Sequence, residues 1–264
     1  MRALLYYLSF LLGALRLVLL VLSLILFVGI GFLLIKLGLI NQSHGFFLRT
    51  QWCKIAIRIL GIQLHVNGNI DLTPGTLYVG NHRSLIDPVI IYSFVKNGYA
   101  VSKAEVAKYP IIGLGAQLSG VIFVERSDSG SRKSAKELIS KYLKEKLSIV
   151  LFPEGTVGVD RLMLPFKKGS FEAAAETNAH VVPFAMELQN PKRDFWIHDH
   201  LLIQFLITFS KLKTIINIHF FDPIASTDAM YLTERSQELI QDQLTLFQKS
   251  WSEKDLFPGL RNKV

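Results

Sequence analysis

The strongest constraint on this chain lies at its start, where residues 3–40 are almost wholly apolar. Residues 17–35 are a run of 19 without a charge, and as a helix such a run spans about 28 Å, close to the hydrocarbon thickness of a bilayer. A cleaved signal peptide fits less well, because the run is long for a signal and no small-residue cleavage site follows it. A buried hairpin of a soluble domain is a further alternative. Arg16 leaves two membrane arrangements open: one helix that crosses after Arg16, or a helical hairpin that dips into one leaflet. Both predict a membrane anchor at residues 1–45, ahead of a globular domain at residues 46–264.

The charge balance of the chain favours a membrane surface as its partner. The net charge is +8, half of the residues are hydrophobic, and the mean hydropathy is +0.33. Positive charge suits nucleic acid or anionic lipid, but the sequence has no Lys/Arg block and no nucleic-acid motif, so we expect lipid and no nucleic acid. Basic residues are more frequent after the apolar run than before it, which predicts an inner (cytoplasmic) membrane protein with its domain facing the cytoplasm. The single cysteine, Cys53, excludes an internal disulfide and a multi-cysteine metal site.

The remaining sequence alternates strand-like and helix-like segments, which predicts one α/β domain with a mixed central sheet flanked by helices. The proline in the 181–186 strand favours an edge or terminal position. Residues 110–115 are expected to be a break and 127–132 a polar loop. The expected strands are 64–66, 76–79, 99–103, 120–124, 148–152, 181–186, 201–209 and 214–221. The expected helices are 51–64, a helix that ends near 94, 104–109, 135–146, 170–178 and 234–251.

A polar turn between the 76–79 strand and the next helix carries the first candidate for chemistry. The turn reads Asn81-His82-Arg83-Ser84-Leu85-Ile86-Asp87-Pro88. Pro88 suits the first helical position, so Asp87 is expected at the N-cap. A neutral imidazole that a carboxylate holds through one nitrogen offers the other nitrogen as a base. His82 and Asp87 are therefore a candidate pair, although Asp87 as a plain helix cap and His82 as a backbone partner is the alternative.

Four stretches together resemble the glycerolipid acyltransferase family, typified by 1-acyl-glycerol-3-phosphate acyltransferases. His82 to Asp87 matches its His-x4-Asp signature, and Phe152-Pro153-Glu154-Gly155-Thr156 matches its third block residue for residue. The stretches at 120–126, which ends Val124-Glu125-Arg126, and at 181–183 resemble its second and fourth blocks. The resemblance covers roughly residues 60 to 225.

This resemblance implies a membrane-bound O-acyltransferase of phospholipid synthesis. The enzyme would move a fatty acyl group from acyl-CoA or acyl carrier protein to the free hydroxyl of a lysolipid, and 1-acyl-glycerol-3-phosphate would give phosphatidic acid. No cofactor and no metal are expected, since the thioester is a co-substrate. The resemblance implies His82 as the base, Asp87 as its orienting partner, and Arg126 as the group that binds the phosphate.

Five further residues, from the first and third motifs, are assigned to substrate binding. The first motif contributes Arg83 and Ser84, and the third contributes Glu154, Gly155 and Thr156. Glu154 would bind the polar head of the acceptor or order its turn. The backbone N–H groups of Gly155 and Thr156 would stabilise an oxyanion.

One departure leaves the acceptor open. Many family members continue the third block with Arg-Ser, whereas this chain reads Val157-Gly158. A lysolipid with a different head group, such as a lyso-ornithine lipid or another lysophospholipid, is therefore an alternative acceptor. A non-catalytic lipid-binding protein and a thioesterase are the alternatives from other classes. His198-Asp199-His200 lacks an evident third ligand, so no metal site is expected there.

Overall fold

The computed structural model describes residues 2–108, 110–124, 129–198 and 200–252, and this part of the chain is organised around one mixed sheet. Its seven strands lie in the order β1-β7-β6-β2-β5-β3-β4. Neighbouring strands are parallel except β6 and β7, so β1 and β7 run against the other five. The strands are β1 (Ile62–Asn67), β2 (Leu77–Gly80), β3 (Gly98–Lys103), β4 (Val121–Val124), β5 (Ser148–Leu151), β6 (Val181–Leu188) and β7 (Thr214–Phe220).

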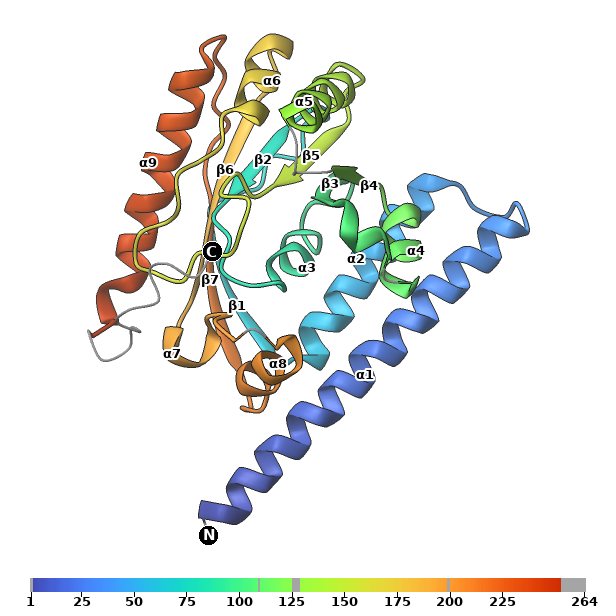
Figure 1. Cartoon of the computed structure of the whole chain (residues 1–264), viewed down its shortest axis with the longest axis vertical. Helices are drawn as coiled ribbons and strands as arrows, with labels where there is room; N and C mark the ends of the chain where they lie inside the picture. Colours follow the sequence, from blue (N-terminus) through green and yellow to red (C-terminus); the bar gives the residue numbers. More distant parts are fainter. Residues whose placement is uncertain (1, 109, 125–128, 199, 253–264) are drawn as a thin grey trace.

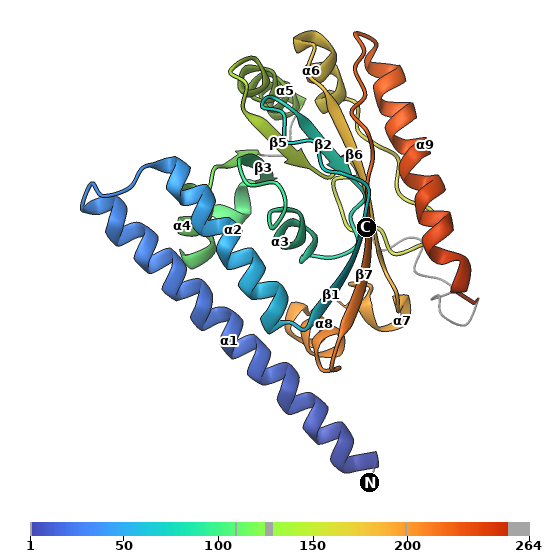
Figure 2. The same cartoon turned by 180° about the vertical axis from the view of Figure 1, so that it is seen from behind.

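Helices cover both faces of the sheet, which gives the mixed α/β architecture that the alternating pattern predicted (Figures 1 and 2). One face packs against α5 (Ser129–Lys144), α6 (Gly169–Thr177) and α9 (Ala229–Phe247). The other carries α2 (Gln42–Ile59), α3 (Asp87–Ile91) and α8 (Leu201–Phe209). The remaining elements are α1 (Arg2–Lys36), α4 (Pro110–Leu118), α7 (Pro191–Asp194) and the short 3₁₀ turns η1 (Ala104–Lys108) and η2 (Gln248–Ser250).

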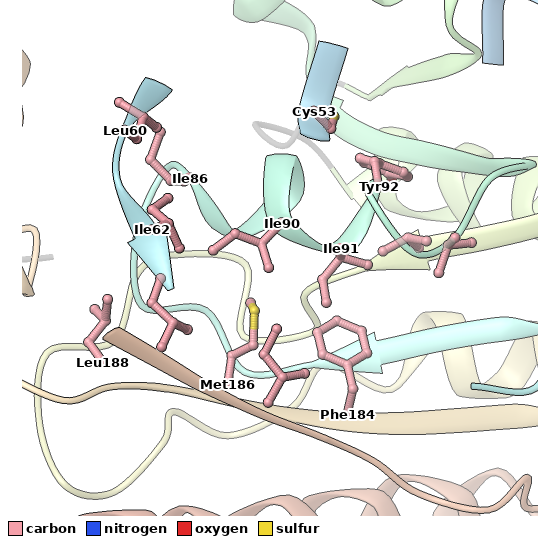
Figure 3. Close-up of a cluster of buried hydrophobic side chains, with 14 of the residues drawn as sticks. Cys53, Leu60, Ile62, Ile86, Ile90, Ile91, Tyr92, Phe184, Met186 and Leu188 are labelled. Atoms are coloured by element: carbon pink, nitrogen blue, oxygen red, sulfur yellow. The ribbon is translucent and has the colours of Figure 1, made fainter. Parts of the chain in front are cut away.

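The short helix α3 is wedged between the sheet and α2. Ile90 and Ile91 have no exposed surface, and Figure 3 shows them between Cys53 on one side and Phe184 and Met186 of β6 on the other. Burial of each isoleucine contributes about 1.5–3 kcal/mol. This packing fixes the direction in which α3 leaves the sheet, and therefore fixes the turn between β2 and α3.

The N-terminal helix α1 is continuous for 35 residues and is the one helix in the described chain that is long and apolar enough to span a membrane. It turns at residues 37–41 into α2, and it packs against α2, α4 and α8. The expected boundary at residue 45 falls inside α2. Arg16 neither ends the helix nor marks a hairpin. Its guanidinium donates to the carbonyls of Phe209 and Leu212 at 2.9 and 2.8 Å, and to that of Lys211, at the carboxyl end of α8.

Three local predictions were wrong because the residue pattern of a short apolar or glycine-containing segment does not distinguish a helix from a strand or a loop. Residues 201–209 form the helix α8, not a strand, and its buried residues Gln204, Phe205, Thr208 and Phe209 follow helical spacing. Residues 110–115 lie in α4, where Gly113 passes so close to Ala107 that a Cβ would lie 2.3 Å from its carbonyl oxygen. The expected polar loop at 127–132 is helical from Ser129 onward, where α5 begins.

The prediction of an edge or terminal position for the 181–186 strand was also wrong, since β6 lies between β7 and β2 and Pro183 is its third residue. Pro183 is tolerated there because of a bulge. The pairing of Phe184 with Phe220 and of Val181 with Ile224 differs by one residue in register. Pro183, which has no N–H to donate, falls at this irregularity, and its carbonyl accepts the N–H of Phe221 at 3.0 Å.

Candidate active site

The two sequence motifs meet at the carboxyl ends of neighbouring parallel strands. β2 and β5 pair with Val79 opposite Leu151, so the chain leaves both strands at the same edge of the sheet. His82 follows the end of β2 by two residues, and Phe152 comes directly after β5. The ring of His82 stacks on that of Phe152, with centroids 4.4 Å apart and planes 17° from parallel. Carboxyl ends of parallel strands are where open α/β sheets bind ligands.

His82 and Asp87 form the expected pair. His82 Nδ1 lies 2.8 Å from Asp87 Oδ2, and the side chain of Asp87 is only 3% exposed. The His82 side chain is 14% exposed, and its Nε2 makes no hydrogen bond within the part of the chain that the structure describes. The Nδ1–H is therefore held by the carboxylate, and the lone pair of Nε2 remains available at the surface.

Asp87 organises the turn as well as the imidazole. Its Oδ2 also accepts the backbone N–H groups of Arg83 and Ser84, at 2.5 and 2.8 Å, and its Oδ1 accepts the hydroxyl of Ser84 at 2.5 Å. The expected N-cap position was wrong by one residue, because Ile86 is the N-cap and Asp87 is the first residue of α3. Ile86 has no polar side chain and so cannot cap the helix, and the carboxylate of Asp87 binds N–H groups of the turn before the helix instead.

Glu154 connects the second motif to the first. Its Oε1 accepts the N–H of His82 at 2.7 Å, and its Oε2 accepts the N–H of Leu164 at 2.8 Å. Burial raises the pKa of Glu154, while these two N–H donors and the Arg83 guanidinium oppose that shift. Gly158 is required beside it, since a Cβ there would lie 2.9 Å from Glu154 Oε2. The expected ordering of the turn by Glu154 is thus visible in the structure, and its binding of an acceptor head group stays a prediction.

The backbone N–H groups of Gly155 and Thr156 differ in whether they are already hydrogen-bonded within the protein. Gly155 has φ +77°, a conformation that suits glycine, and its N–H donates to the carbonyl of Phe152 at 3.0 Å. This bond occupies the donor that was expected to stabilise an oxyanion. The Thr156 N–H makes no hydrogen bond within the described chain, so of the two expected donors it is the one that stays available.

The remaining first-motif residues point away from the surface. Arg83 is 1% exposed, and its guanidinium pairs with Glu187 at 2.9 Å and donates to the carbonyls of Gly158 and Asp160 at 3.2 and 2.7 Å. Ser84 is 2% exposed and is engaged by Asp87. These contacts hold the turn, and substrate binding by either side chain stays a prediction. Arg126 lies outside the described residues, so its place relative to His82 is untested.

Sequence reasoning missed several residues that build the site. Asn81 is fully buried and extends the sheet beyond β2: its side-chain amide donates to the carbonyl of Met186 and accepts the N–H of the same residue, both at 2.8 Å. The only feature of the sequence that could have indicated a role for Asn81 is its position next to His82. Glu187 carried no signal, because its contact with Arg83 joins positions 104 residues apart. Among the described residues no His, Cys, Asp and Glu cluster could hold a metal; Asp199 lies outside them.

Comparisons with known proteins agree with this geometry. A family model described as Acyltransferase matches residues 61–187. A 1-acyl-sn-glycerol-3-phosphate acyltransferase of Borreliella burgdorferi is 30% identical over 72% of this chain and 74% of its own length. A 1-acyl-sn-glycerol-3-phosphate acyltransferase of Limnanthes douglasii is 32% identical over 50% of this chain and 48% of its own length. A lyso-ornithine lipid O-acyltransferase of Rhizobium meliloti is 32% identical over 53% of this chain and 50% of its own length.

The fold comparison extends over almost the whole chain. The crystal structure of the 1-acyl-sn-glycerophosphate acyltransferase PlsC from Thermotoga maritima superposes with a TM-score of 0.69, covers 91% of this chain and 100% of its own, and is 22% identical. At that identity the likeness establishes the fold. Together with the family model and the Borreliella relative, it shows that the chain belongs to the acyltransferase family.

Proposed function

We propose that this protein transfers a fatty acyl group from a thioester to the free hydroxyl of a lysolipid. The observation that carries the proposal is the His82 imidazole, which is fixed by Asp87 through Nδ1 and has an unbonded Nε2 at the surface. An alcohol becomes a useful nucleophile when a base removes its proton during attack. A binding module needs no such base.

The reaction balances with this pair alone. The lysolipid oxygen attacks the thioester carbon while its proton passes to His82 Nε2, and Asp87 stabilises the imidazolium that forms. The tetrahedral intermediate then expels the thiolate, which takes the proton back from His82 and leaves as a thiol. The substrate hydroxyl thus stands where the serine of a catalytic triad would be, and the sequence contains no Gly-x-Ser-x-Gly motif that would supply one.

The oxyanion of the intermediate needs donors near His82. The N–H of Thr156 is suited to this role because it follows the Glu154 turn that bonds directly to His82. Loss of one such donor typically raises the barrier by about 3 kcal/mol. Phe152 holds the plane of the imidazole by stacking, which keeps Nε2 directed at one place.

For the acceptor we propose 1-acyl-glycerol-3-phosphate, which gives phosphatidic acid. The names of the relatives support this acceptor. A second acceptor, a lyso-ornithine lipid, is favoured by the Rhizobium relative and by the absence of Arg-Ser after Thr156. The donor is acyl-CoA or acyl carrier protein, and both carry the same thioester.

We further propose that α1 and α2 seat the protein on the cytoplasmic face of the inner membrane, with the catalytic domain in the cytoplasm. Large apolar side chains of α1 are exposed along the side away from the domain, for example Leu11, Leu22 and Leu33 at 54–62% exposure. Contact of α1 with α2, α4 and α8 favours a helix that lies along the domain in one leaflet over one that crosses the bilayer alone. Both substrates carry long apolar chains, and a site at the membrane avoids transfer of each CH₂ to water at about 0.8 kcal/mol.

The deciding experiment combines an acceptor panel with one variant. Purified protein in mixed micelles receives one radiolabelled acyl-CoA and, in turn, lysophosphatidic acid, other lysophospholipids and a lyso-ornithine lipid. We expect a labelled diacyl product with lysophosphatidic acid, and loss of about 100- to 10,000-fold in rate with His82→Ala. Free fatty acid without lipid product would identify a thioesterase instead. Label that stays in the thioester with every acceptor would overturn the enzymatic proposal.

A further inference from the structure

The segment after α9 reaches the catalytic turn from outside the region that the family model covers. Gln248 begins η2 and is 4% exposed. Its side-chain Nε2 donates to Glu187 Oε2 at 2.8 Å and to the carbonyl of Arg161 at 3.1 Å. Both hydrogens of the amide nitrogen are therefore used, by the buried carboxylate of Glu187 and the partly buried carbonyl of Arg161.

The same two acceptors bind the guanidinium of Arg83. Its terminal nitrogen lies 2.9 Å from Glu187 Oε2 and 3.4 Å from the Arg161 carbonyl. Gln248 and Arg83 thus form a closed ring with Glu187 and the 158–161 loop. The ring connects to the chemistry at two points: the N–H of Arg83 donates to Asp87, and the carbonyl of His82 accepts the N–H of Gly158 at 2.8 Å.

Trp251 gives the same segment a second contact with this network. Its carbonyl accepts a hydrogen bond from the Arg161 guanidinium at 3.0 Å, and its ring meets that of Phe195 edge-on at 5.7 Å. The Arg83 guanidinium lies over the ring of Phe195, 5.2 Å from its centroid. Both residues of the C-terminal segment therefore contact residues that in turn contact Arg83: Gln248 through Glu187, and Trp251 through Phe195.

We propose that Gln248 is a positioning residue for the acyl transfer: through Glu187 and Arg83 it fixes the turn that carries His82 and Asp87. This inference rests on the proposed function for its kinetic part. It places a determinant of activity 61 positions beyond the last residue that the family model matches, at the carboxyl end of the described chain.

The physical basis is the cost of a buried carboxylate with too few donors. Glu187 is 1% exposed, and burial raises its pKa against the stabilising effect of Arg83 and Gln248. Removal of the amide leaves the Glu187 carboxylate with Arg83 and the N–H of Leu188, and takes the 3.1 Å donor away from the Arg161 carbonyl. Arg83 then shifts to serve both acceptors, and its backbone N–H moves relative to Asp87. A displacement of about 1 Å at a catalytic group costs roughly 100-fold in rate.

The test replaces the amide with an apolar side chain of the same length. Gln248→Met is compared with Gln243→Met, a matched change on α9 at a half-buried glutamine whose side chain makes no hydrogen bond among the described residues. We expect Gln248→Met to lower kcat by about 10- to 100-fold with KM for donor and acceptor within about twofold of wild type. We expect Gln243→Met to retain wild-type kcat. Equal kcat in the two variants, or a change confined to KM, would overturn the positioning role.

A second measurement does not depend on activity. Hydrogen exchange read by mass spectrometry compares peptides that contain residues 82–87 with peptides from the middle of α9. We expect faster exchange in the 82–87 peptide of Gln248→Met and unchanged exchange in α9. Uniform acceleration across both peptides would mean general destabilisation and would overturn the proposal. If the wild-type protein transfers no acyl group, the proposed function fails, while this exchange pattern still decides the coupling of Gln248 to the turn.

Discussion

The number of donors around Asp87 makes the outcome of one substitution predictable in detail. Among the described residues, Oδ2 accepts three N–H groups, the ring Nδ1–H of His82 and the backbone N–H of Arg83 and of Ser84, whereas Oδ1 accepts only the hydroxyl of Ser84. In Asp87→Asn the amide oxygen must take the Oδ2 position, because an NH₂ group there would oppose three donors. The new NH₂ group then faces Ser84, whose hydroxyl rotates from donor to acceptor. The His82 tautomer with a proton on Nδ1 is therefore preserved.

The expected loss follows from this orientation. What disappears is the negative charge that stabilises the imidazolium, and a hydrogen bond to a charged group contributes about 1.5–3 kcal/mol. At tenfold for each 1.36 kcal/mol, the rate falls by about 10- to 150-fold. In a serine-protease triad, where the same change stabilises the wrong tautomer, the loss is about 10,000-fold. Loss of the charge alone and stabilisation of the wrong tautomer thus predict rates for Asp87→Asn that differ enough to be distinguished by measurement.

The assay measures kcat for acyl transfer with both substrates saturating, for wild type, Asp87→Asn and Asp87→Ala. Asp87→Ala removes every acceptor and is expected to lose roughly 10,000-fold, since the imidazole keeps its stacking on Phe152 but loses the carboxylate that sets its tautomer and rotation. We expect Asp87→Asn to retain at least tenfold more activity than Asp87→Ala, with a folded protein by circular dichroism. Equal losses in the two variants would refute the argument from donor count.

Three further predictions concern residues elsewhere in the chain. Arg126→Ala is expected to raise KM for a phosphate-bearing acceptor by about 10- to 150-fold, as loss of a charge-assisted contact implies; an unchanged acceptor KM would exclude phosphate recognition by Arg126. Cys53 is 2% exposed, and burial raises the pKa of its thiol to about 12. It should resist a maleimide at pH 8 in the native protein and react in denaturant, and labelling before unfolding would contradict its burial. Arg16→Met leaves three carbonyls at the end of α8 without their donor, so we expect the free energy of unfolding in detergent to fall by about 2 kcal/mol. Lys36→Met, in the last turn of α1, serves as its control, and equal stability of the two variants would count against the role of Arg16.

The sequence allowed the location of the site to be predicted because each motif directly follows a buried strand. The sequence predicted a strand at each of the seven strands of the described sheet, and the carboxyl ends of parallel neighbours meet at one edge. The proximity of His82 to the Glu154 turn follows from that rule. The identity of the bonds did not follow. Nothing in the local sequence pattern indicates that Glu154 accepts the backbone N–H of His82. Nor does it indicate that the N–H of Gly155 donates to the carbonyl of Phe152 within the same turn.

Most of the features that could not be predicted from the sequence depend on contacts between residues far apart in the chain. The Arg83–Glu187–Gln248 ring joins residues 61 to 104 positions apart, and no periodicity reports such a pairing. Residues 201–209 illustrate the other difficulty. A nine-residue apolar segment satisfies a strand and a buried helix equally well, and tertiary packing against α1 decides between them.

The bonds of Arg16 have a consequence for the order in which the molecule assembles. Its three acceptor carbonyls lie 193 to 196 positions later in the chain. At about 5–20 residues per second, the ribosome needs roughly 10–40 s to supply them after Arg16 has been made. During that interval the nascent helix carries an uncompensated guanidinium, which keeps its head at the lipid–water boundary. Final docking of the first helix is therefore among the last events of biogenesis, and it waits for a segment near the opposite end of the polypeptide.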